Sequence, residues 1–216
     1  MKKFWQVIFV IIGFIITVVA TSYVATEHDK SNYDPANYVR DVHVHRLESK
    51  FDASREALAV EVDKYINAVA PTAVLDALNI IDLCSEYNVD IRLVLVQGHV
   101  ESHFATKGTA ARTNSVFNVG AYDGDSANKQ IKNGFGYKHP DYSIEPYLKL
   151  LTTSYLVNGK TELDLINKFV NSEGKRYASA ANYEEMLKER WEKIDSVADI
   201  TSKYEDYKMY KLMLGR

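Results

Sequence analysis

The feature that most constrains this chain is an uncharged, apolar run near its start. After Lys2 and Lys3, residues 4–25 read FWQVIFVIIGFIITVVATSYVA and carry no charged side chain. A helix of this length would measure about 33 Å, which is enough to cross the hydrocarbon core of a bilayer. Because the two lysines would stay on the cytoplasmic side, we expect residues 1–25 to form a transmembrane signal anchor with the remaining chain outside.

The alternative interpretation is a cleaved signal peptide, which begins with the same basic and apolar regions. Val18-Val19-Ala20 supplies small residues that suit cleavage after residue 20. The protein would then be exported or periplasmic rather than held in the cell membrane. In both interpretations the sequence predicts that the rest of the chain is exported.

The composition of the exported part limits the classes of partner that it can bind. It has 24 basic and 29 acidic residues, a net charge of −5, and no basic stripe. Nucleic acid is therefore an unsuitable partner, because phosphate backbones are bound by clustered Lys and Arg. Cys84 is the single cysteine, so no internal disulfide can form. We interpret it as a small buried apolar residue.

The remaining 191 residues suit one globular domain behind a short connector. Residues 26–52 are polar and contain the pair Asp34-Pro35, so they are predicted to be a linker. Residues 53–216 form the predicted domain, in which apolar side chains recur at helical spacing. The helical segments lie near 53–70, 72–87, 90–108, 143–157, 161–171, 182–198 and 202–213.

Helical periodicity is interrupted between residues 109 and 141. This stretch is rich in glycine, polar and aromatic residues. Such a segment inside a compact domain is typically functional rather than a plain connection. The expected fold is therefore mainly α, with a small Gly-rich lobe built of loops or short strands.

Glu101 is the candidate functional residue, near the end of the helix that leads into this lobe. The stretch IRLVLVQGHVESHFATKG begins at Ile91 and places Gln97, Gly98 and Phe104 on the same face as Glu101. Glycine costs about 1 kcal/mol in a helix interior, and Gly98 would leave space for a ligand one turn before the acid. A carboxylic acid among apolar groups can keep its proton and protonate a leaving oxygen, as a glycosidase acid does. The alternative is a solvated acid at a helix end.

His99 and His103 flank Glu101 but do not form a metal site with it. They stand four residues apart and share one helix face, whereas Glu101 points about 200° away. The order also differs from the His–Glu–x–x–His motif of zinc peptidases. We expect no metal and no cofactor; a pair of histidines completed by a distant third ligand is the competing hypothesis.

Four segments in series resemble the glucosaminidase family of the lysozyme-like superfamily, glycoside hydrolase family 73. QGHVES is similar to the family's Gln–x–x–x–Glu–Ser/Thr segment, and TNSVFNVGAYDG to its Asn–x–Leu–Phe–Gly–Ile segment. YSIEPYLKLLTTSYL resembles the helix after the lobe, and RYASAANYEEMLKERWEKI the Tyr–Ala–x–x–x–x–Tyr segment. The resemblance covers residues 72–198. Asn118 stands where the family usually has glycine.

This resemblance implies a lysozyme-like fold and a peptidoglycan hydrolase, with Glu101 as general acid. The β-1,4-linked glycan strands of peptidoglycan would lie in a groove between the helical body and the Gly-rich lobe. Phe117 would pack under Glu101, and Tyr177 would line the groove opposite. The substrate-binding candidates are Gln97, Gly98, Asn114, Phe117, Asn118 and Tyr177.

The second catalytic group is less defined. Asp123 and Asp125 in AYDGD are the best candidates for a second carboxylate, although both could simply be turn residues beside Gly124. Without a second acid, the N-acetyl group of the substrate could act as nucleophile. The expected activity is that of an endo-β-N-acetylglucosaminidase. A lytic transglycosylase, an N-acetylmuramidase and a non-catalytic peptidoglycan-binding or virion structural module stay open as alternatives.

Overall fold

The computed structural model describes residues 35–119 and 136–216. The chain divides into two units, residues 1–48 and 49–216, and the second unit holds the site around Glu101. The apolar segment 4–25, expected to be a membrane anchor, lies outside the described residues. Among the helices that are described, none has the length and apolar character needed to cross a membrane.

The first described helix, α2, spans Pro35–Val69 and begins inside the stretch expected to be a polar linker. Residues 35–52 are therefore helical, so the helix begins well before its expected start near residue 53. Proline is well tolerated in the first turn of a helix, where its missing N–H has no partner to lose. The apolar stripe used to place the helix start marks only the part that packs: Leu58 and Val62 are buried, whereas Val39 is 66% exposed.

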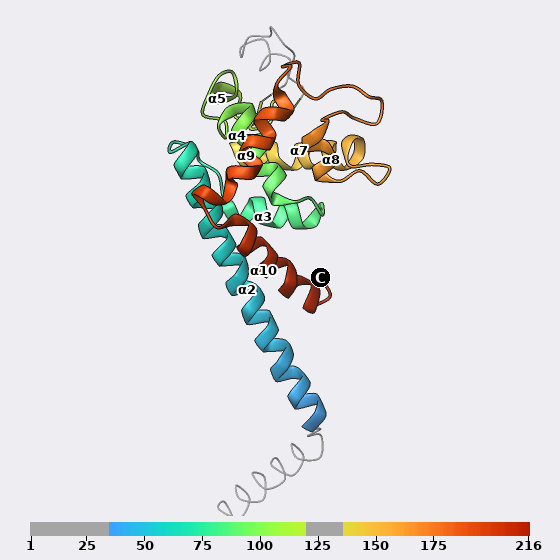
Figure 1. Cartoon of the computed structure of the whole chain (residues 1–216). Coiled ribbons are helices and arrows are strands. Elements are labelled where there is room, and N and C mark those ends of the chain that lie inside the picture. Colours follow the sequence, from blue (N-terminus) through green and yellow to red (C-terminus); the bar gives the residue numbers. More distant parts are fainter. Residues whose placement is uncertain (1–34, 120–135) are drawn as a thin grey trace, which may run out of the picture. The chain divides into compact units, whose positions relative to one another are not determined.

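The other elements follow in short succession (Figure 1). A 3-10 turn (η1) and a π-helical turn (η2) flank α7. Over residues 35–119 and 136–216 there is no strand, only an isolated antiparallel bridge between Val170 and Arg176. The mainly α prediction is thus confirmed for this part of the chain. The bounds are α3 Ala77–Glu86, α4 Ile91–Ser102, α5 Ala110–Thr113, η1 Pro140–Ser143, α7 Ile144–Leu150, η2 Leu151–Tyr155, α8 Glu162–Asn167, α9 Tyr183–Val197 and α10 Ile200–Met213.

Helix α4 forms the centre of the domain. Its residues 93–98 are buried on every side, which is the pattern of a core helix rather than of an amphipathic surface helix. Asp90 caps its start by accepting a hydrogen bond from the backbone N–H of Arg92 at 2.9 Å. Helix α9 packs along α4, as Figure 1 shows, and α3 and α10 contact it as well. The end of α4 is therefore held from several directions.

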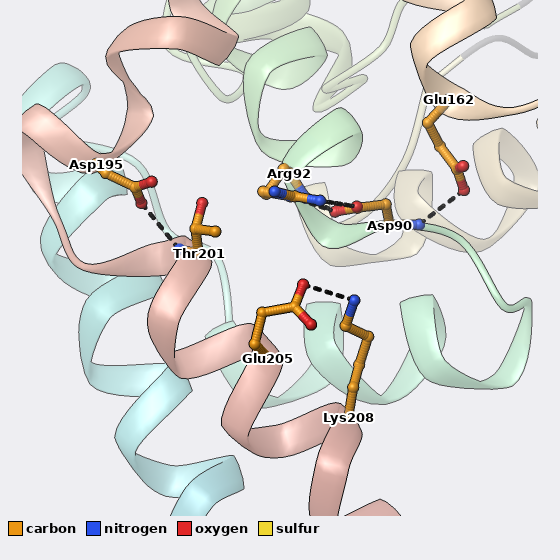
Figure 2. A network of polar contacts seen from close by, with 7 residues as sticks. All are labelled: Asp90, Arg92, Glu162, Asp195, Thr201, Glu205 and Lys208. Carbon is orange, nitrogen blue, oxygen red and sulfur yellow. Dashed lines mark hydrogen bonds and ion pairs between the residues drawn. The ribbon is translucent and has the colours of Figure 1, made fainter. Parts of the chain in front are cut away.

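Arg92 anchors the C-terminal helix α10 to this centre. Its guanidinium forms a bidentate pair with Asp90, and Glu162 accepts the backbone N–H of Asp90 at 3.0 Å (Figure 2). The same guanidinium lies 4.7 Å from the ring centroid of Trp191 on α9 and 6.0 Å from that of Tyr204 on α10. Stacking of this kind is a role that Arg fills and Lys does not. One cation thus joins α4, α9 and α10.

Candidate active site

Glu101 lies in the last turn of α4, half-buried, with a hydrogen-bond donor on each carboxylate oxygen. Tyr183, the first residue of α9, donates its hydroxyl to Oε1 at 2.5 Å. Asn118 donates its side-chain amide to Oε2 at 3.3 Å and to the backbone carbonyl of Glu101 at 3.3 Å. Tyr183 and Asn118, which are 82 and 17 positions away from Glu101 in the sequence, therefore both donate to this carboxyl group.

The hydrogen bond from Tyr183 is the last of a buried chain. Tyr147 donates to Oε1 of Gln97, and Nε2 of Gln97 donates to the hydroxyl of Tyr183 at 2.9 Å. Tyr147, Gln97 and Tyr183 are each at most 3% exposed. Because each hydroxyl has a single proton, these bonds can run only from Tyr147 towards Glu101. Oε1 of Glu101 is therefore the acceptor at the end of this chain.

The phenols of this chain stay protonated. Burial raises the pKa of Tyr183 and of Tyr147 well above the ordinary value, and the negative charge of Glu101 raises each further. Both hydroxyls therefore act as donors at any pH at which a carboxylic acid titrates. A hydrogen-bond donor at Oε1 stabilises the ionised form of the Glu101 carboxyl group.

Aromatic rings support the site from below. Phe117 is 1% exposed and stacks on Tyr147, with ring centroids 3.7 Å apart. Tyr177 is half-buried, donates its hydroxyl to the carbonyl of Phe117 at 2.6 Å and stacks on Tyr183 at 6.1 Å. Burial raises the pKa of Tyr177 well above its ordinary value, with the charge of Glu101 as the second cause. Phe117 thus packs beneath the site, and Tyr177 positions the backbone next to Asn118.

The space beside Gly98 is filled by protein. A Cβ atom built there would lie 2.9 Å from the ring of Phe104 and 3.1 Å from a methyl group of Val116. Phe104 and Val116 are both buried and cannot move aside cheaply. Glycine is therefore needed for close packing at this position, which corrects the expectation that it leaves room for a ligand.

The turn that ends α4 is strained. His103, Phe104 and Ala105 have φ angles of 48°, 55° and 62°, so three consecutive non-glycine residues are left-handed. This conformation costs roughly 1–2 kcal/mol per residue. Ser102 offsets part of the cost, because its buried hydroxyl donates to the carbonyl of Val116 and accepts the N–H of Ala105, both at 2.7 Å. The serine thereby fixes the loop that carries Asn118 to the end of α4.

Replacing Ser102 by alanine should lower the free energy of unfolding by about 2–3 kcal/mol. The change leaves a buried carbonyl at Val116 and a buried N–H at Ala105 without their partner. Chemical denaturation of the full chain would measure it, with Ser196→Ala as control. Ser196 is exposed and bonds only to the carbonyl of Lys193, so its loss should stay within about 0.5 kcal/mol. Equal effects in the two variants would contradict the role given to Ser102.

Comparison with known proteins identifies the family. The model of the glucosaminidase family, described as mannosyl-glycoprotein endo-beta-N-acetylglucosaminidase, matches residues 77–196. This span is more than half of the chain and contains Gln97, Glu101, Asn118, Tyr147 and Tyr183. The chain belongs to the glucosaminidase family. No curated protein and no solved structure matches it.

The family match confirms the resemblance seen in the sequence, and it makes the chain a member of a glycoside hydrolase family. Helices α2 and α10 lie outside the matched residues, one on each side of the glucosaminidase span. The site around Glu101 is built within that span, from α4, α7, α9 and the loop after α5.

The other predicted site residues are distributed as follows. Asn114 is half-buried and donates to the carbonyl of Tyr137 at 2.9 Å, while the N–H of Tyr137 donates to the carbonyl of Thr113 at 2.7 Å. Asn114 therefore helps to hold the beginning and the end of the Gly-rich segment together. Asp123 and Asp125 lie outside the described residues. Gln97 is buried and reaches Glu101 through Tyr183.

Tyr147 and Tyr183 are the site residues that the sequence does not single out. Tyr183 is the last tyrosine of the Tyr–Ala–x–x–x–x–Tyr segment, but the sequence alone assigns it no role at the site. A usable signal exists for both, because a tyrosine on the apolar face of a helix needs a partner for its hydroxyl. Gln97, a polar residue inside an apolar run, is the natural partner.

His99 and His103 form a cluster separate from the hydrogen-bond chain that ends at Glu101. The rings of His99 and His103 lie 4.9 Å apart, and the hydroxyl of Tyr65 on α2 is 3.0 Å from Nδ1 of His99. No group of three or more potential metal ligands occurs in the part of the chain that the structure describes. Burial lowers the pKa of His99 to about 4, helped by the positive charges of Arg190, His103 and Lys107.

His99 should make the protein less stable in acid. Its folded-state pKa lies below the ordinary value of 6.5, so between pH 6.5 and 4 the unfolded chain gains a proton that the folded protein does not. The free energy of unfolding should therefore fall with pH, by about 1–2 kcal/mol for a partly solvated ring. In His99→Gln this fall should be much smaller, with a contribution left from His103, whose pKa is also lowered by burial. In His45→Gln, at an exposed position on α2, the fall should persist in full. Parallel pH profiles for His99→Gln and the wild type would contradict this account.

Proposed function

We propose that this glucosaminidase is a peptidoglycan hydrolase, an endo-β-N-acetylglucosaminidase in which Glu101 is the general acid. The observation that supports this role is the arrangement of Tyr183 and Asn118 on the two oxygens of a half-buried carboxyl group. A carboxyl group that was merely solvated at the end of a helix would not need a buried chain of hydrogen-bond donors leading to it. The position of Glu101 in the family-matched span supports the same assignment.

The proposed reaction begins with transfer of the proton on Oε2 of Glu101 to the glycosidic oxygen. The C1–O bond breaks and the sugar develops oxocarbenium character. Tyr183 stabilises the resulting carboxylate through Oε1. A water molecule then forms the new C1–O bond and returns a proton to Glu101, so the acid is restored.

The second catalytic group in this proposal is Asp123 or Asp125, or the N-acetyl carbonyl of the substrate itself. The two aspartates follow Asn118 within a few residues, in the segment whose ends are joined at Asn114 and Tyr137. Asn118 and Tyr177 are the proposed substrate contacts, since both are half-buried at the site. Gln97, Gly98, Asn114 and Phe117 support them through packing and hydrogen bonds.

Peptidoglycan is the proposed substrate for two reasons. The sequence resembles wall-degrading glucosaminidases across four segments, and the apolar stretch at residues 4–25 predicts export, which would bring the enzyme to the cell wall. The family description names a mannosyl-glycoprotein as substrate of an endo-β-N-acetylglucosaminidase. Both polymers present N-acetylglucosamine, so the two substrates can be compared directly.

The test incubates the full chain with purified peptidoglycan sacculi and, separately, with a mannosyl-glycoprotein, and identifies released fragments by mass spectrometry. Muropeptides ending in reducing N-acetylglucosamine, released equally with and without a chelator, are the expected result. Reducing N-acetylmuramic acid or anhydro ends would instead identify a muramidase or a lytic transglycosylase. Sacculi that bind the protein but stay intact would refute the hydrolase and favour a binding module.

A further inference from the structure

A cavity lies at the opposite end of α4 from Glu101. It has a volume of about 160 Å³, is open to solvent on one side, and is lined mainly by residues of α2, α3 and α10 together with the first residue of α4. Its size is close to that of an engineered protein cavity of about 150 Å³ that binds benzene. The floor is apolar and aromatic, formed by Leu58, Ile81, Cys84, Ile91, Tyr204 and Tyr207.

The rim of this cavity is basic. Lys208, Lys211 and Arg216 are among the lining residues, and no lining residue is acidic. The charge of Lys208 is already compensated, because its ammonium pairs with Glu205 at 2.7 Å (Figure 2) and lies 4.7 Å from the ring centroid of Tyr204. Apolar walls under a basic rim suit a ligand with an apolar part and a negative charge.

Lys211 differs from Lys208 in its partners. Its ammonium donates to the backbone carbonyl of Ser85 at 3.1 Å and to the hydroxyl of Ser85 at 2.5 Å. Ser85 lies in the last turn of α3, so these acceptors offer the partial negative charge of a helix end but no full negative charge. Lys211 is half-buried, and no carboxylate of residues 35–119 or 136–216 forms a salt bridge with it. A charge withdrawn from water is normally paired, so this ammonium is suited to an external anion.

We infer that this cavity binds a small amphiphilic anion: an aromatic ring or short alkyl chain that carries a carboxylate. The apolar part enters the cavity between Leu58, Ile81 and Tyr207, and the carboxylate pairs with Lys211. The site is separate from the glycosidase site, since Ile91 and Glu101 are ten residues, or about 15 Å, apart along α4. Lys211, Tyr207 and Leu58 lie outside the span that matches the family model.

Three probes of similar size and different charge test this inference: benzoate, benzyl alcohol and benzylamine. Each is titrated into the full chain, and binding is followed by the methyl NMR signals of Ile81 and Ile91. Ile166, buried in α8 away from the cavity, serves as the internal control. We expect saturable shifts of the two cavity signals with benzoate, at least tenfold weaker binding of benzylamine, and no shift of Ile166.

Substitutions of Lys211 then test the ion pair. Lys211→Gln keeps a donor for Ser85 but removes the charge, so it should weaken benzoate binding about tenfold and leave benzyl alcohol unchanged. Lys211→Arg should restore benzoate binding. Lys203→Met, on the same helix but outside the cavity and paired with Asp199, should bind benzoate like the wild type.

Two outcomes would overturn the inference. Equal affinities for benzoate and benzylamine would show an apolar cavity that is indifferent to charge. Shifts that fail to saturate, or that are the same in Lys211→Gln and the wild type, would show that Lys211 holds no anion. A thermal melt of each variant establishes that the compared proteins are folded.

Discussion

Glu101→Gln should reduce the kcat for peptidoglycan cleavage by about 10³-fold and leave the protein folded. The amide has the size of the acid and can still accept the hydrogen bond from Tyr183, but it cannot give a proton to the leaving oxygen. General acid catalysis typically contributes 10²–10⁴-fold, which sets this magnitude. The rate of fragment release from sacculi, at matched protein concentration, measures the effect.

The matched control for this prediction is Glu185→Gln. Glu185 is exposed in the first turn of α9, two residues from Tyr183, so the same chemical change is made beside the site but outside it. Its activity should equal that of the wild type. An active Glu101→Gln variant would remove Glu101 from the mechanism, and with it the assignment of the site.

Tyr183→Phe should have the second largest effect, a fall in kcat of about 10- to 100-fold with little change in KM. The substitution removes the donor at Oε1 of Glu101 and leaves Nε2 of Gln97 without its acceptor. A carboxylate that has lost a donor is less stable relative to its protonated form, so the basic limb of the pH–activity profile should move to higher pH. The free energy of unfolding should also fall by about 1–3 kcal/mol.

The pH profile separates a positioning role of Tyr183 from a purely structural one. A tyrosine that only packed would lower stability without moving the basic limb. Tyr142→Phe is the control, because Tyr142 is 63% exposed and its hydroxyl lies outside the chain of donors. A Tyr183→Phe variant with unchanged kcat and an unchanged pH profile would disprove the positioning role.

The sequence predicts the helical architecture well because burial imposes a regular spacing on it. Recognisable capping residues mark two of the helix starts: Asp90 caps α4, and Thr161 with Asp164 forms a capping box at α8. The sequence does not predict the early start of α2, again because the prediction depends on burial. The first half of α2 has no buried apolar face, so its side chains show no helical periodicity.

The candidate site could be predicted only in part. Glu101 was found because a carboxylic acid at the end of an apolar helix is costly and therefore informative, and the family motif supported it. The chain from Tyr147 through Gln97 depends on side chains 50 and 86 positions apart, which no local pattern reveals. Gly98 was misread because an intrahelical glycine can equally make room for a ligand or for a neighbouring side chain, here Phe104.

The strained turn behind Glu101 is covered by a residue from outside the span that defines the family. Tyr65 of α2 places its ring edge-on to Phe104, with centroids 6.2 Å apart, and bonds to His99 in the preceding turn. The segment that carries Glu101 and this flanking helix should therefore share one opening free energy in amide hydrogen exchange. A fragment cut to residues 77–196, the span of the family match, would lack Tyr65 and leave the turn after Glu101 uncovered. A chimera that transplants this span into another glucosaminidase should therefore include α2.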